Sequence, residues 1–184
     1  MKRLQLPLRE EERMSLKAGD AVLLSGEIYT ARDAAHKRLH EMIERNEELP
    51  FDLNDAVIYY VGPTPAKPGQ AIGSAGPTTS GRMDPYAPQL LDLGLKGMIG
   101  KGKRNDQVKD AIVRNKAVYF VAVGGAGALL SHSIMKREPV AFDDLLAEAI
   151  TKLTVKDFPC FVGIDCLGRD IYDRDERVPG REEL

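Results

Sequence analysis

Three positively charged side chains lie close to the expected starts of helices: Arg32, Arg82 and Lys101. A helix N-terminus already favours anions, because of its unpaired backbone N–H groups and the helix dipole. A cation there adds little to helix stability, but it can hold an anion against the helix end. Open α/β sheets also bind ligands beyond the carboxyl ends of their strands. The three cations therefore suit a small molecule with two carboxylates, although each taken alone is equally compatible with a solvated surface charge.

The densest polar motif is segment 76–82, with the sequence GPTTSGR. It carries three hydroxyl side chains, among them Thr78, between two glycines, and it ends at Arg82. Hydroxyls and backbone N–H groups of a glycine-rich turn can orient carboxylates or relay a proton. The competing interpretation is an ordinary turn in which a hydroxyl group bonds to its own backbone.

Other candidate motifs are weaker. Segment 124–127 (GGAG) follows an apolar run but lacks the third glycine of a dinucleotide-binding fingerprint, so tight packing of a helix on a strand explains it better. His36 lies one turn after Arg32, where it either positions a neighbour or joins a surface ion pair, the second being slightly favoured. Cys160 and Cys166 are predicted to pack in the core, and two cysteines are too few to hold an iron–sulfur cluster alone.

The elements that position these residues alternate between strand and helix, which predicts the α/β class. The apolar residues of segment 31–45 recur with a helical period. The predicted helices cover residues 31–45, 84–94, 105–114 and a patch that ends at 134. The predicted strands cover residues 20–30 (interrupted at Ser25-Gly26), 56–61, 95–99, 117–123 and 159–165.

The expected helix starts have recognisable capping residues. Thr30 and Asp33 have the spacing of a capping box, Asp84 followed by proline suggests an N-cap, and Asn105 or Asp106 can cap the third helix. Between the second strand and the second helix lies a loop rich in proline and glycine, residues 62–81. So long a loop in a small domain is usually functional.

Composition narrows the class of protein. The chain has 184 residues, which suggests one domain over 1–184. The 26 Lys and Arg against 28 Asp and Glu leave a net charge of -2, which argues against a general nucleic-acid or membrane-surface binder. No apolar run approaches the ~20 residues of a membrane span, and the first residues do not resemble a signal peptide. With only two cysteines, the expected compartment is the reducing cytoplasm. The charged tail after Asp170 is expected to be frayed or docked on a partner.

Several segments together resemble a known family. Segment 25–38, which contains the run TARDAAHKR, looks like the opening motif of the β subunit of class I iron–sulfur fumarate hydratase, a motif shared with the L-tartrate dehydratase β subunit. Segments 76–84 (GPTTSGRMD) and 99–102 (IGKG) match the same family in the same order, and 155–159 (VKDFP) is similar to its C-terminal segment. The resemblance covers nearly the whole chain, and the combination of motifs is specific.

The resemblance implies a swivelling β/β/α three-layer fold and a hydro-lyase. Another subunit or domain of such an enzyme binds a [4Fe–4S] cluster through three cysteines, so this chain itself is expected to hold no metal. The family's substrate-binding positions fall on Arg32, Arg82 and Lys101. Its threonine proposed to exchange the carbon-bound proton falls on Thr78, which is expected to pass its proton to a carboxylate of the partner.

The sequence thus predicts the β subunit of a cytoplasmic fumarase-type enzyme that hydrates fumarate reversibly to (S)-malate. Its expected partner is a cluster-bearing α subunit in an α2β2 heterotetramer, with no nucleic acid and no membrane involved. The cation cluster is expected to be uncompensated within this chain and to face a cleft that the partner completes. Two alternatives stay open: an L-tartrate dehydratase β subunit, and a non-catalytic ligand-binding or assembly module.

Overall fold

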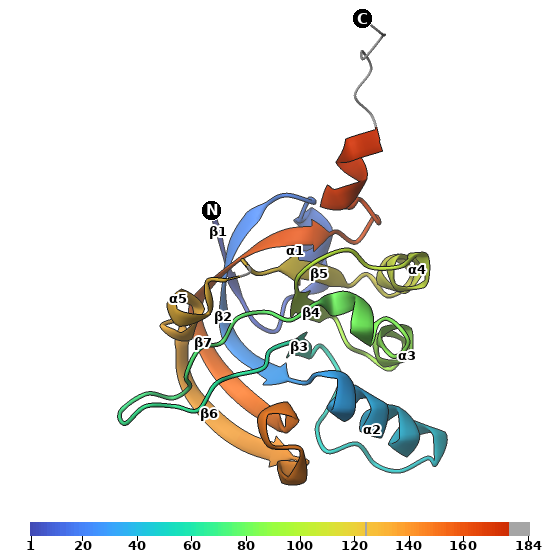
Figure 1. Ribbon diagram of the computed structural model, residues 1–184. Helices are drawn as coiled ribbons and strands as arrows, with labels where there is room; N and C mark the ends of the chain where they lie inside the picture. The colour runs from blue at the N-terminus through green and yellow to red at the C-terminus, as the bar shows by residue number, and fades with distance from the viewer. Residues whose placement is uncertain (124, 177–184) are drawn as a thin grey trace, which may run out of the picture.

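The strands of the computed structural model, which describes residues 1–123 and 125–176, form one seven-stranded sheet in the order β1-β2-β3-β4-β5-β7-β6 (Figure 1). The strands are β1 (Lys2–Gln5), β2 (Ala21–Thr30), β3 (Val57–Tyr59), β4 (Gly97–Gly100), β5 (Val118–Val121), β6 (Ile134–Ala141) and β7 (Ile150–Ile164). The helices are α1 (Glu10–Ser15), α2 (Asp33–Glu44), α3 (Ala87–Asp92), α4 (Asp106–Asn115) and α5 (Gly127–Ser131). Short 3₁₀ helices lie at η1 (Ser80–Met83), η2 (Asp143–Glu148) and η3 (Ile171–Glu176). The predicted α/β class is confirmed.

The sheet closes on itself through its longest strand. β1 to β5 pair with their neighbours in parallel, whereas β7 runs antiparallel to β2, β5 and β6. Since β7 pairs with both β2 and β5, the strands β2, β3, β4, β5 and β7 form a closed ring. The register of β2 against β7 shifts between Leu24 and Gly26, which is the interruption that the sequence predicted.

Alternate residues of the central strands face two separate cores. In β3, Tyr59 joins the cluster that holds Phe120 and Val162, whereas Ile58 joins the cluster that holds Leu39 and Ile112 of the helices. Figure 1 shows α2, α3 and α4 together on one side of the sheet. Burial of both faces explains why these strands read as continuous apolar runs.

The long loop after β3 packs on the rest of the domain. Its Ile72 and Ala75 join the same core as Tyr59, and the Tyr59 hydroxyl donates a hydrogen bond to the Ala75 carbonyl. Ala71 lines a hollow together with Arg137 of β6 and Thr151 of β7. Residues 64–70 of the loop are exposed, whereas the part from Ala71 onward is anchored on the core. Its far end carries the GPTTSGR segment.

Two of the three predicted helix caps are wrong. The N-cap of α2 is Arg32, and the Thr30 hydroxyl instead lies 2.8 Å from that of Thr151 in β7. α3 begins at Ala87, so Asp84 is not its cap. The third is confirmed: the Asn105 side chain accepts a hydrogen bond from the Val108 N–H at the start of α4.

The sequence missed β1, α1, β6 and the first part of β7, and it extended the last helical patch too far, because α5 ends at Ser131. The predicted strands at 56–61, 95–99 and 117–123 correspond to β3, β4 and β5. Of the charged tail, residues 171–176 form η3, while 177–184 lie outside the described residues, as does Gly124 of the glycine cluster. Among the described residues, no helix combines the length and the apolar composition of a membrane span.

Candidate functional site

The ends of β3 and β4 bring two of the predicted segments together. The Thr78 N–H donates a hydrogen bond to the Tyr60 carbonyl (2.8 Å), directly after β3. Thr79 pairs with Lys101 in a parallel bridge, and the Ser80 N–H donates to the Lys101 carbonyl (2.9 Å). The GPTTSGR segment thus lies beside the residue that follows β4. Open α/β sheets bind their ligands at this edge, beyond the carboxyl ends of parallel strands.

Arg82 links this segment to the start of α2. Its Nη2 donates a hydrogen bond to Thr78 Oγ1 at 2.6 Å, and its Nε lies 3.3 Å from Asp33 Oδ1 in an ion pair. The two charged side chains are 49% and 39% exposed. The expectation of an uncompensated cation cluster is therefore wrong for Arg82, because Asp33 faces it. Within the described residues the Thr78 hydroxyl meets the Arg82 guanidinium, and the carboxylate expected from the partner stays a prediction.

Arg32 lies against the backbone that follows β3. A Cβ atom added at Gly62 would overlap the Arg32 guanidinium, so only a glycine leaves room for that side chain. Arg32 Nε is buried without a hydrogen-bond partner among the described residues. An arginine carries five N–H donors and no acceptor. Arg32 therefore has donor capacity that the described part of the chain leaves unused.

The His36 side chain forms a hydrogen bond to the backbone of Arg32. It is fully buried, so the favoured interpretation as a surface ion pair is wrong. Its Nδ1 donates to the Arg32 carbonyl at 2.8 Å, while Nε2 has no partner in the described part of the chain. Burial lowers the pKa of His36 to about 4, although the hydrogen bond to Arg32 opposes the shift. The ring is therefore neutral at pH 7.

A buried ion pair below the site ties the two segments together. Arg104 Nε donates to Asp84 Oδ1 at 2.6 Å, and the Asn105 N–H donates to the other carboxylate oxygen at 2.9 Å. The Arg104 guanidinium also lies over the rings of Tyr60 and Tyr119, 5.3 and 4.9 Å from their centroids. Asp84 follows Arg82 by two residues, and Arg104 follows Lys101 by three. The pair thus fixes the spacing between the two predicted binding segments.

Tyr119 adds a second link in the same place. Its hydroxyl lies 2.8 Å from Ser80 Oγ and 2.8 Å from the Gly102 carbonyl oxygen. Sequence reasoning missed this support, because it assigned Asp84 to a helix cap and gave Arg104 no role. The available signal in the sequence was spacing alone: Asp84 lies two residues after Arg82, and Arg104 lies three residues after Lys101.

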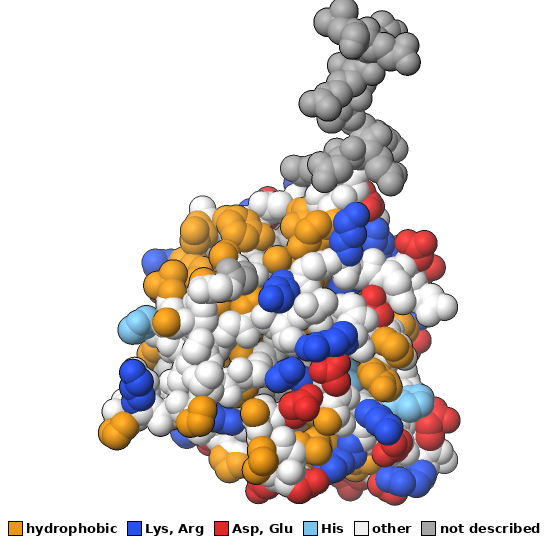
Figure 2. Space-filling model, in the orientation of Figure 1, with side chains coloured by type: hydrophobic (Ala, Val, Ile, Leu, Met, Phe, Trp, Pro, Cys, Tyr) orange, Lys and Arg blue, Asp and Glu red, His pale blue; other side chains and the backbone are white. Residues whose placement is uncertain are grey.

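The structure therefore connects Arg32, Thr78, Arg82 and the Lys101 segment around the ends of β3 and β4. The helix-end part of the anion-binding argument applies best to Arg32, which caps a twelve-residue helix. It does not apply directly to Arg82, which lies in η1 ahead of a six-residue helix, or to Lys101, which lies several residues before α4. Their role in binding an anion stays a prediction. Lys101 itself is exposed. Figure 2 shows Lys and Arg side chains across the middle of this face, with Asp and Glu among them.

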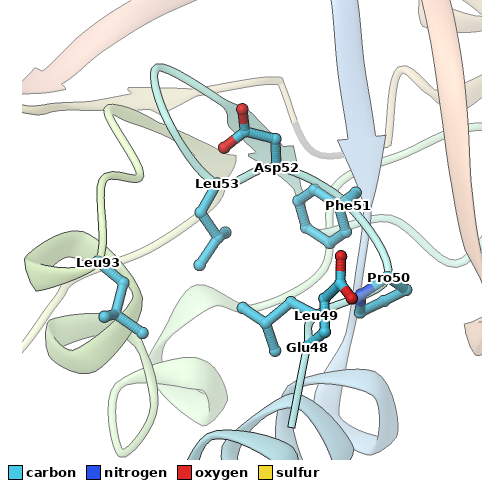
Figure 3. Close-up of a pocket in the computed structure, with 7 residues that line it drawn as sticks. All are labelled: Glu48, Leu49, Pro50, Phe51, Asp52, Leu53 and Leu93. Carbon is cyan, nitrogen blue, oxygen red and sulfur yellow. The ribbon is translucent and has the colours of Figure 1, made fainter. Parts of the chain in front are cut away.

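One surface hollow, of about 500 Å³, lies elsewhere on the molecule. It is lined by residues 48–53 and by Leu93, with apolar side chains around it and two acids among them (Figure 3). It contains none of the candidate site residues. The strand-end site is therefore defined by its side chains and their contacts, and not by this hollow.

The described residues contain no group of three or more His, Cys, Asp or Glu side chains arranged to hold a metal ion. Cys160 and Cys166 are both buried, as predicted. Burial raises the pKa of the Cys166 thiol to about 11. The cysteines of this chain do not fit the role of ligands to an iron–sulfur cluster.

These features define an α/β protein that gathers cations and a hydroxyl group at the ends of parallel strands. The family model described as Fumarase C-terminus matches residues 2–175, and the chain belongs to that family. The predicted family resemblance is thus confirmed.

Relatives of two sizes match the chain. It is 42% identical over 153 residues to "Fumarate hydratase class I, aerobic" of Salmonella typhimurium. That match covers 82% of this chain and 26% of that protein. It is 39% identical over 158 residues to "Fumarate hydratase 2" of Leishmania major, covering 85% of this chain and 28% of that protein. It is also 39% identical over 172 residues to "Putative L(+)-tartrate dehydratase subunit beta" of Methanocaldococcus jannaschii. That match covers 90% of this chain and 88% of that protein. The chain thus spans about a quarter of the fumarate hydratases but most of the β subunit.

Proposed function

We propose that this chain is the β subunit of a two-subunit cytoplasmic hydro-lyase that hydrates fumarate reversibly to (S)-malate. The proposal includes one domain over residues 1–184, with the swivelling β/β/α three-layer arrangement of the family. It is supported by the family membership, by relatives named as fumarate hydratases, and by the match in length to a relative named as a separate β subunit.

The observation that carries the proposal is the contact between Arg82 and Thr78. Arginine has no hydrogen-bond acceptor, so Thr78 Oγ1 accepts the bond from Arg82 Nη2. The single hydroxyl proton of Thr78 is then free to point at a substrate carbon. In hydration Thr78 donates this proton to carbon and regains one from a carboxylate of the partner. In dehydration that carboxylate first removes the hydroxyl proton, so that Oγ1 can take the proton from carbon. The adjacent guanidinium stabilises the negative charge that develops on Oγ1 when the proton leaves.

Substrate binding is assigned to the three cations. A dicarboxylate carries two negative charges, and Arg32, Arg82 and Lys101 offset them. Arg32 contributes its unused buried N–H donor, and the end of the Arg82 guanidinium that faces away from Asp33 can grip a carboxylate. The same cations offset the charge that builds on the substrate as its carbon-bound proton leaves.

The remaining chemistry is assigned to a partner. A cluster-bearing α subunit, in an α2β2 heterotetramer, would hold a [4Fe–4S] cluster that acts as Lewis acid on the hydroxyl group that leaves as water. The residues of this chain do not fit such a cluster, so its contribution is limited to binding and to proton transfer. No role for nucleic acid or membrane is proposed.

A second substrate is favoured by one specific observation. The relative that this chain matches over 88% of its length is named as a putative L(+)-tartrate dehydratase subunit. Tartrate is also a 2-hydroxy diacid, and it needs the same cationic side chains. A tartrate dehydratase β subunit is therefore the alternative, and a non-catalytic ligand-binding or assembly module is the alternative outside enzymology.

The deciding experiment is anaerobic co-expression of the chain with its partner, followed by hydratase and dehydratase assays on a panel of diacids. Fumarate and malate are expected to be the best substrates. Preference for tartrate selects the alternative substrate, and inactivity towards every diacid with an intact cluster selects the non-catalytic module.

Substitutions at Thr78 and Arg82 test the assigned roles in the same complex. Thr78→Ala is expected to lower kcat by roughly 10²–10⁴-fold with little change in KM, the usual loss when a positioned acid–base group is removed. Thr78→Ser keeps the hydroxyl and retains much of the rate. Arg82→Lys keeps the charge but loses the planar fork, so KM rises as the rate falls. Near-normal turnover of Thr78→Ala would leave Thr78 as a turn residue only.

A further inference from the structure

The Arg82 guanidinium is held from two sides by residues of different segments. Thr78 Oγ1 accepts from Nη2 at 2.6 Å, and Asp33 Oδ1 lies 3.3 Å from Nε. Asp33 is the first residue of α2, a helix that packs Leu39 and Ala35 into the core. The carboxylate that faces Arg82 is therefore mounted on a rigid element, whereas Arg82 lies in the short turn η1.

An arginine in this position needs such a support. The Arg82 side chain is 49% exposed, and an unconstrained arginine samples many rotamers. The ion pair at Nε restricts this freedom. Nη1 takes part in neither of the two contacts. The same contact offsets part of the positive charge beside Thr78.

We propose that Asp33 is a positioning residue, which holds Arg82 by Nε so that Nη2 stays on Thr78 and Nη1 stays open to a substrate carboxylate. This inference rests on the proposed function for its catalytic consequence. Its rival is that Asp33 and Arg82 form an ordinary surface ion pair without effect on function. A second rival is that Asp33 competes with the substrate for Arg82.

Steady-state kinetics of the assembled complex separate these possibilities. Asp33→Asn keeps the shape of the side chain and removes its charge, so Arg82 loses its anchor. We expect kcat to fall by about 10- to 100-fold, the scale of a misplaced functional group, while KM stays constant or falls because the site becomes more cationic. The matched control is Asp144→Asn, which removes the 2.8 Å ion pair to Arg38 on the same helix and is expected to change neither constant. Unchanged kcat, with or without a lower KM, would overturn the proposal.

A second measurement uses the full chain without its partner, so it does not depend on the proposed function. The ¹H–¹⁵N resonance of Arg82 Nε, assigned by its loss in Arg82→Lys, reports how this group is held. In Asp33→Asn it is expected to shift and to exchange faster with water, whereas Asp144→Asn leaves it unchanged. If Asp33→Asn leaves the resonance unchanged, Asp33 does not hold Arg82. If the complex hydrates no diacid, the proposed function fails while this measurement still decides the contact.

Discussion

Two arginine–aspartate pairs lie close together in this molecule. They consist of the same residue types but differ in distance and in exposure to water. Arg104 and Asp84 approach to 2.6 Å with side chains that are 0% and 9% exposed. Arg82 and Asp33 approach to 3.3 Å, with side chains 49% and 39% exposed. Asp84 and Arg82 are only two residues apart, so one short segment contributes to both pairs.

The difference in environment assigns each pair a different task. Around the buried pair, the Tyr60 hydroxyl accepts a hydrogen bond from Arg104 and the Asn105 N–H donates one to Asp84, while the guanidinium lies over the ring of Tyr119. Such a pair is costly to break, because either charge alone would be left buried. The pair of Arg82 and Asp33 is exposed to water, so a ligand can reach the guanidinium without breaking the pair. The buried pair therefore fixes the spacing of the two segments, and the exposed pair is accessible to a ligand.

The largest expected effect comes from breaking the buried pair. Arg104→Met keeps most of the side-chain volume but leaves Asp84 as an uncompensated buried charge. We expect the free energy of unfolding to fall by about 3–5 kcal/mol, as measured by urea denaturation. Arg114→Met, which removes an exposed pair with Asp92, is the control and is expected to cost less than ~1 kcal/mol. Equal losses in the two variants would remove the distinction between buried and exposed pairs.

A somewhat smaller effect is expected from the buried histidine beside the site. His36 has a pKa of about 4 in the folded state against 6.5 as its ordinary value. As pH falls from 6.5 to 4, the unfolded chain takes up a proton at His36 and the folded chain does not, so stability is lost across this window. The loss is about 3 kcal/mol at pH 4. Above pH 6.5 the residue is neutral in both states and contributes no pH dependence.

The variant His36→Asn checks this window. Between pH 7 and 4, the free energy of unfolding is expected to fall less steeply with pH for His36→Asn than for the unmodified chain, because the titrating group is gone. His132→Asn, at an exposed position, is the matched control and keeps the original slope. A slope unaffected by His36→Asn would assign the acid sensitivity to other groups.

The smallest effect on stability is expected from a substitution at Gly62. A methyl group there overlaps the flexible end of Arg32, which can move aside. Gly62→Ala is therefore expected to change the free energy of unfolding by less than ~1 kcal/mol. KM for the diacid should rise by up to about tenfold, since ~1.4 kcal/mol corresponds to a factor of ten.

A double-mutant cycle identifies the cause. If Gly62→Ala acts by displacing Arg32, it has little further effect on KM in an Arg32→Gln background, because contacting residues are not additive. Additive effects of the two changes would place the action of Gly62 elsewhere. The assay is the same diacid hydration as for Thr78.

Local patterns in the sequence predicted the parts of this protein that local physics decides. The apolar runs of β3 and β5 need only two buried faces, and the Asn105 cap needs only a side chain three residues before an N–H group. Because parallel strands end at the same edge of a sheet, the sequence also indicated that Thr78, Arg82 and Lys101 lie near one another. Their roles remain proposals.

The tertiary structure decided which partner each polar side chain takes. Asp84 and Asp33 are both plausible helix-terminal residues in sequence, yet their carboxylates face Arg104 and Arg82, 20 and 49 residues away. A local cap gains one hydrogen bond to a solvated helix end, whereas the buried carboxylate of Asp84 must be matched by a charge and several donors to offset its desolvation. Only the folded chain supplies those donors together, so the choice between cap and ion pair is made by long-range packing.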